Sequence, residues 1–123
     1  MTFLMISRKL NDDSDLLENN LEKIVDFIKD NTKENEPILI GNILTGNFRN
    51  KLTDYGFKFK VQPQAVKSLK NHNNKLIREN DPILFIHVNN SGNVRKFIYY
   101  ANEQPGKSLN ILEINTDIYN QLQ

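Results

Sequence analysis

The apolar and polar positions near the start of the chain predict one amphipathic helix over residues 14–30. Ser14 is a suitable N-cap. The acidic side chains in the first turn are favourable there because they lie at the positive end of the helix dipole. Pro37 prevents the helix from continuing past the polar residues 31–36. Residues 1–13 are expected to form a short strand or an arm. The apolar side chains recur at spacings of three and four and so share one buried face, formed by Leu17, Leu21, Ile24, Val25 and Ile28.

Short strands and helices follow this helix. Residues 37–41 form an apolar run closed by glycine, and residues 57–61 alternate apolar side chains with lysines, so both are expected to be strands. Residues 48–55 are expected to form a short helix that ends at Gly56. Another helix is predicted from Pro63 to Asn71, resuming towards residue 79.

The last third of the chain is predicted to be antiparallel. Apolar runs at residues 82–88, 94–101 and 108–114 are separated by turns rich in Asn, Gly and Pro, which is the pattern of a meander. Thr116 is a suitable cap for a short helix to residue 122. The expected fold class is α+β: an N-terminal helix, short strands and helices, and a C-terminal antiparallel three-stranded meander packed against helices.

A chain of 123 residues is expected to form a single domain. Within it, residues 1–36 would be an acidic arm and helix, residues 37–115 an α+β core, and residues 116–123 a C-terminal helical turn. The chain has no cysteine, which excludes disulfides, thiolate catalysis and cysteine-based metal sites. The early apolar run at residues 3–6 is too short for a membrane span or a signal peptide, so a soluble cytoplasmic protein is expected.

The charges are sorted into two blocks. Residues 11–36 carry nine acidic side chains against three lysines, a local net charge of −6. Residues 49–78 carry eight basic side chains against Asp54 alone, a local net charge of +7. Two interpretations are open: the acidic block covers the basic one, or the basic block faces an anionic partner.

Few residues have the chemistry of a catalytic site. His72 follows a basic run, and Lys67 lies five residues before it, so a histidine base beside a cation that holds phosphate is one hypothesis. The alternative is a polar residue at a solvated helix end. His87 and Arg95 are further candidates, although a histidine in a half-buried strand is more often structural. The two histidines alone do not predict a metal site, and no cofactor is expected.

Basic and aromatic residues also suggest a nucleic-acid interface. Aromatic rings stack on unpaired bases while cations hold phosphates. The tyrosines fit a second interpretation equally well, in which they are only strand formers at the edge of the core. The candidate nucleic-acid-binding residues are Lys58, Lys60, Lys70, Lys75, Arg78 and Tyr99.

Several segments between residues 38 and 114 follow a common pattern. They are Ile40-Gly41-Asn42-Ile43, Phe59-Lys60-Val61, the helix over residues 65–72, Asp81-Pro82-Ile83, residues 95–100 and the closing strand over residues 109–114. In this pattern residues 38–114 resemble a phage-associated nuclease family, the phage members of the barnase, EndoU, colicin E5/D and RelE-like group. The resemblance implies metal-independent RNA cleavage with His72 and Lys67 in or near the site. Ser68 stands where many members have a histidine, which is compatible with an inactive relative.

Three functions therefore compete. The first is a small RNase-like effector of a phage or mobile element that cleaves RNA without metal, with His72 as general base or acid. The second is a non-enzymatic inhibitor of a host defence or nuclease complex that binds a host nucleic-acid-binding protein. Its acidic helix would imitate nucleic acid through Glu18, Glu22, Asp26 and Asp30. The third is an accessory domain whose charge blocks set oligomer contacts, such as those of a homodimer.

Overall fold

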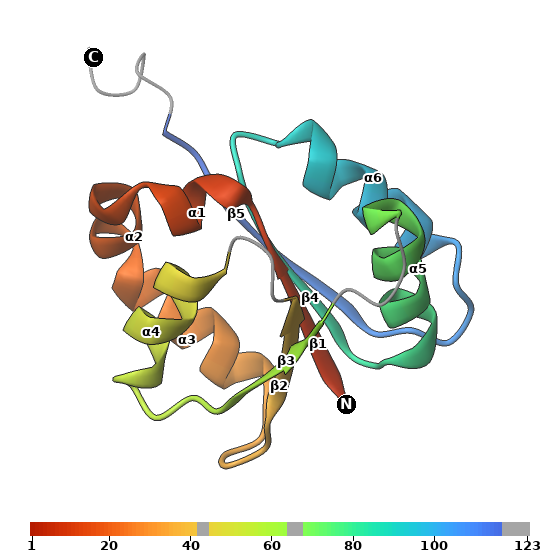
Figure 1. The fold of residues 1–123 in the computed structure, drawn as a ribbon, viewed down its shortest axis with the longest axis horizontal. Helices are drawn as coiled ribbons and strands as arrows, with labels where there is room; N and C mark the ends of the chain where they lie inside the picture. Colours follow the sequence, from red (N-terminus) through yellow and green to blue (C-terminus); the bar gives the residue numbers. More distant parts are fainter. Residues whose placement is uncertain (42–44, 64–67, 117–123) are drawn as a thin grey trace.

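A five-stranded sheet, parallel throughout, forms the centre of the molecule (Figure 1). The computed structural model describes residues 1–41, 45–63 and 68–116. The strands are β1 (Thr2–Ile6), β2 (Ile38–Gly41), β3 (Phe59–Gln62), β4 (Ile83–Val88) and β5 (Leu109–Ile114). The helices of the described part are α1 (Arg8–Asp12), α2 (Ser14–Asn19), α3 (Leu21–Asn31), α4 (Gly46–Thr53), α5 (Leu69–Glu79) and α6 (Gly92–Asn102).

The strand order is β3-β2-β1-β4-β5, so the chain starts in the middle of the sheet and builds outwards in two directions. After β1 the chain adds β2 and β3 on one side, and it then crosses back to add β4 and β5 on the other. This is the doubly wound arrangement, in which the direction of winding changes between two neighbouring strands. Here the change falls between β1 and β4.

Helices cover both faces of the sheet. Figure 1 shows α1 to α4 on one side of the strands and α5 and α6 on the other. The strands need apolar side chains on both faces because both are covered, and all six residues of β4 are buried. One core lies under α1 to α4 and includes Leu4, Leu10, Ile24, Ile28, Ile40, Phe48, Leu84 and Ile86. The second lies under α5 and α6 and includes Phe3, Met5, Leu76, Ile77, Phe85, Val94 and Ile98.

The predicted antiparallel meander is wrong. Residues 94–101, predicted to be its middle strand, lie in helix α6, where Val94, Ile98 and Ala101 are buried. These positions are spaced by four and three residues and lie on one face of a helix. Because α6 carries the chain from one end of β4 to the other, β5 pairs with β4 in parallel. The predicted strands over residues 37–41, 57–61, 82–88 and 108–114 are confirmed as β2, β3, β4 and β5, with small shifts of their ends.

The N-terminal third agrees with expectation only in part. Of the two alternatives for residues 1–13, the short strand is confirmed: residues 2–6 form β1, the central strand of the sheet. The predicted long helix is two helices that meet at Asn20, and the first is capped by Asp13, whose side chain accepts a hydrogen bond from the Leu16 amide, 3.0 Å. The predicted helix after Thr116 falls on residues 117–123, which lie outside the described residues. No helix within residues 1–41, 45–63 or 68–116 has both the length and the apolar character needed to cross a membrane.

Candidate functional site

A cleft of about 1130 Å³ opens at the carboxyl ends of β1 and β4, between the edge of the sheet and helices α5 and α6. In doubly wound sheets the loops after two neighbouring strands diverge where the winding direction changes, and ligands bind in the crevice between them. The lining residues come from both sides of that point. They include Ser7, Arg8 and Lys9 after β1 and Asn89, Ser91 and Asn93 after β4.

Hydrogen bonds fix the end of the cleft where β1 and β4 meet. Ser7 is 3% exposed, and its amide donates to the carbonyl of Ile86, 2.9 Å, while its Oγ accepts from the amide of Val88, 2.9 Å. Asn89 exchanges two side-chain hydrogen bonds with Thr116, of 2.6 and 2.8 Å, so the loop after β4 is tied to the segment after β5. Asn89 and Asn90 have φ of 52° and 54°, a backbone region that asparagine adopts more readily than most residues.

The other end of the cleft lies beside β2 and α5. Thr45 is buried, and its Oγ1 donates to the carbonyl of Gly41 and accepts from Nε of Arg49, 3.1 Å. Gln62 at the end of β3 and Asn73 and Asn74 of α5 add uncharged amides to the lining. This end therefore offers several uncharged hydrogen-bonding groups.

The lining is positively charged. Among the described residues that line the cleft are four cations, Arg8, Lys9, Lys70 and Lys96, and one acid, Glu103, which gives a formal net charge of +3. Arg8 pairs with Asp12 at 3.0 Å, but both side chains are largely exposed. Because an exposed ion pair is weak, Arg8 can still attract an anion.

Helix α6 begins at the cleft. Its N-cap is Ser91, whose side chain makes no capping hydrogen bond, in contrast to Ser68 of α5, whose Oγ accepts from the Asn71 amide at 3.2 Å. The first amides of an 11-residue helix carry the positive end of its dipole and have no partner within the helix. The amide end of α6 therefore adds to the positive potential of the lining.

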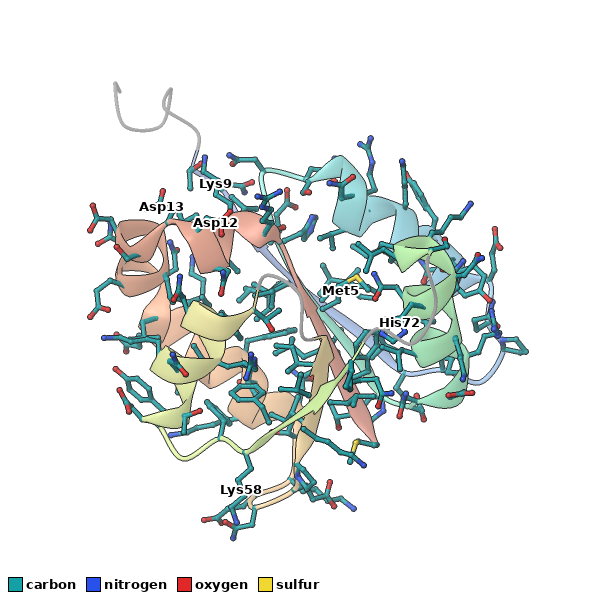
Figure 2. All side chains as sticks on the ribbon, in the orientation of Figure 1. Met5, Lys9, Asp12, Asp13, Lys58 and His72 are labelled. Carbon is teal, nitrogen blue, oxygen red and sulfur yellow. The ribbon has the colours of Figure 1, made fainter. Side chains whose placement is uncertain are left out.

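His72 forms part of the cleft wall. It is 5% exposed, and Figure 2 shows it on the side of α5 that faces the sheet, near Met5 of β1. Its burial follows from its position one turn before Leu76, on the apolar face of the helix. Within the described part of the chain, Nε2 of His72 is buried and has no hydrogen-bond partner.

The other predicted catalytic residues are not brought to the cleft. His87 is 5% exposed on β4, is not among the lining residues, and lies in register with Glu113 of the edge strand β5. Arg95 is exposed on α6 and is also absent from the lining. Lys67 lies outside the described residues. Of the predicted catalytic residues that the structure describes, His72 therefore lines the cleft, and His87 and Arg95 do not.

The predicted nucleic-acid-binding residues do not share one surface. Lys70 and Tyr99 line the cleft, and Arg78 donates to Oη of Tyr100, 2.8 Å. Lys75 is exposed on α5, and Lys60 is exposed on β3. Lys58 precedes β3, at the amino edge of the sheet, and Figure 2 shows it at the opposite end of the molecule from Lys9.

The predicted acidic face is exposed but belongs to two helices. Glu18 lies on α2, and Glu22, Asp26 and Asp30 lie on α3. Across the described ranges, one ion pair joins the acidic block to the basic block, between Glu18 and Lys51 at 2.9 Å. The hydrogen bond to Glu18 and the attraction of its charge raise the pKa of Lys51. The acidic block therefore does not cover the basic one as a whole.

Sequence reasoning missed Arg8, Lys9 and Lys96. For Arg8 and Lys9 the available signal was that polar residues follow directly after the apolar run at residues 2–6, as they also do after the run at residues 83–88, whereas Lys96 has no such signal. That signal identifies a site only if the two runs are known to be adjacent parallel strands. No cluster of three or more metal-ligating side chains occurs in the part of the chain that the structure describes. No family model, curated protein or solved structure matches this chain.

Proposed function

We propose that this chain binds a phosphate-bearing small ligand in the cleft at the carboxyl ends of β1 and β4. The observation that carries the proposal is a lining of four cations and one acid at the point where the sheet changes its winding direction. Cationic side chains and the amide end of α6 favour an anion there for the same electrostatic reason. The phosphate would lie near Lys96 and the start of α6.

The size and the aromatic side chains of the cleft favour a nucleoside phosphate over a phosphate ion. About 1130 Å³ is far more than one phosphate fills, and it exceeds the usual range for small-molecule sites. Phe97, Tyr99 and Tyr100 of α6 also line the cleft, and the hydrogen bond from Arg78 holds the ring of Tyr100 in place. Aromatic faces of this kind stack on nucleobases.

Calorimetric titration with AMP, GMP, CMP and UMP tests the proposal. The Lys96→Ala variant removes a cation of the lining and is expected to weaken the tightest of these complexes about threefold to tenfold at low salt. Lys58→Ala removes a lysine at the opposite edge of the sheet and is the matched control, with affinity expected within twofold of wild type. Equal losses in both variants, or no binding by wild type, would contradict the proposal.

RNA cleavage by His72 is a second candidate, because His72, Lys70 and Tyr99 line the same cleft. In this case wild type degrades total RNA in EDTA to discrete products, and His72→Ala does not, while its circular dichroism is unchanged. A histidine within reach of the ribose hydroxyl can act as general base. Degradation that survives His72→Ala would rule out this site, and intact RNA with wild type would rule out the activity.

The inhibitor hypothesis stays a prediction. Glu18, Glu22, Asp26 and Asp30 are exposed, which is the condition for a charge mimic that binds a host nucleic-acid-binding protein. That the chain forms a homodimer, and that it lies in the cytoplasm of a bacterial host, also stay predictions.

A further inference from the structure

His72 leaves a polar atom unsatisfied in the folded chain. The side chain is 5% exposed, and its Nε2 atom has no partner among the described residues. A buried hydrogen-bonding atom without a partner destabilises the folded state, and such atoms are uncommon in native structures. A bound ligand that supplies the missing partner would recover this loss.

The surroundings of His72 indicate what kind of group that partner is. The end of the cleft beside β2 and α5 contains the side-chain amides of Gln62, Asn73 and Asn74, with Lys70 as its one charged side chain in the described lining. The cations Arg8, Lys9 and Lys96 belong to the end beside β1 and α6. The two ends therefore suit different parts of one ligand: an anion near α6, and an uncharged hydrogen-bonding part near α5.

We propose that His72 is a specificity-determining residue that reads the sugar or base of a nucleoside phosphate. Its Nε2 forms a hydrogen bond with that uncharged part of the ligand, while the phosphate lies at the start of α6. A ribose hydroxyl can donate or accept, so it satisfies Nε2 in either tautomer of the imidazole. This inference rests on the proposed binding function and deepens it, since it explains how the cleft separates nucleoside phosphates from phosphate alone.

The chain offers a matched control in His87. It is also 5% exposed and also has a buried ring nitrogen, Nδ1, without a partner among the described residues. It lies on β4, and its side chain is not part of the cleft lining. Replacing either histidine by leucine removes an unsatisfied polar atom, but of the two only His72 is among the residues that line the cleft.

The test compares wild type with His72→Leu, His72→Gln and His87→Leu. Affinities are measured by calorimetry for AMP, GMP, CMP, UMP and inorganic phosphate. His72→Leu is expected to weaken the tightest nucleotide complex about tenfold and to leave phosphate affinity within twofold. His72→Gln keeps a polar atom near the position of Nε2 and is expected to stay within about threefold of wild type for the nucleotide. His87→Leu is expected to leave both affinities unchanged.

Thermal unfolding without ligand separates this role from a structural one. If Nε2 is kept for a ligand, His72→Leu removes an unsatisfied atom, and the melting temperature rises by about 2 °C or more. A lower melting temperature, or wild-type nucleotide affinity in His72→Leu, would overturn the inference. So would an equal loss of phosphate affinity.

The affinities of wild type for phosphate and for nucleotides separate a failure of the His72 role from a failure of the proposed binding function. If wild type binds inorganic phosphate and binds no nucleotide more tightly than phosphate, the role of His72 is wrong but the proposed binding function is still supported. If wild type binds neither phosphate nor any nucleotide, both fail. Should His72→Leu not fold, His72→Phe is measured in its place, because its ring has a similar size and no hydrogen-bonding atom. Nucleotide affinity within twofold of wild type in that variant would overturn the inference.

Discussion

At the scale of single residues, Ser7 joins the two strands whose ends define the cleft. It is the buried N-cap position of α1, and its Oγ accepts the hydrogen bond of the Val88 amide at the end of β4. One short side chain thus ties the central strand to its neighbour where the cleft begins. The position is set by the sheet register, which pairs Ile6 with Ile86.

Ser7→Ala is expected to lower the free energy of unfolding by about 1–3 kcal/mol, because it leaves the Val88 amide buried without a partner. Urea denaturation measures the change. Ser91→Ala is the control, since the Ser91 side chain makes no capping hydrogen bond, and it is expected to stay within about 0.5 kcal/mol of wild type. Equal effects of the two substitutions would show that the bond to Val88 does not stabilise the cleft.

Single residues could be selected from the sequence only where their chemistry is distinctive. His72 was selected because histidine is one of few side chains suited to proton transfer near neutral pH, and it does line the cleft. Arg8, Lys9 and Lys96 look like ordinary surface cations in the sequence. Their significance comes from the pairing of β1 with β4, which no local pattern contains.

At the scale of elements, helix α6 determines both the topology and one wall of the cleft. Its residues include the β-branched Val94 and Ile98 and the aromatic Phe97, Tyr99 and Tyr100, a composition typical of strands. The spacing of the buried residues is helical, and burial against the sheet outweighs intrinsic propensity. Composition and spacing disagreed over residues 94–101, and the prediction followed composition.

This one element had large consequences. A strand at residues 94–101 makes β4 and β5 parts of a meander, whereas a helix there makes them parallel neighbours. The error also placed Tyr99 on a nucleic-acid-binding sheet face, although it is exposed on a helix that borders the cleft. The apolar runs of the strands themselves were identified correctly because they are short and bounded by turn residues.

At the scale of the whole molecule, the charge blocks of the sequence do not correspond to the charged surfaces of the fold. The basic block over residues 49–78 runs from α4 on one face, along the edge strand β3, to α5 on the other face. It supplies Lys70 to the cleft, while Arg8, Lys9 and Lys96 come from outside it. The positive charge of the cleft therefore comes from segments that are distant in the sequence, and the basic block is spread over both faces and one edge of the sheet.

Heteronuclear NMR of the labelled protein during titration with a nucleoside monophosphate tests the binding claim most directly. Saturable shifts are expected in the amides of Arg8 and Lys9, in those of Gly92, Asn93 and Val94 at the start of α6, and in that of His72. Little change is expected at Lys58, which precedes β3, and at Lys60 on β3. Shifts centred on β3 or on the acidic residues of α2 and α3 would contradict it, and so would the absence of any shift at millimolar ligand.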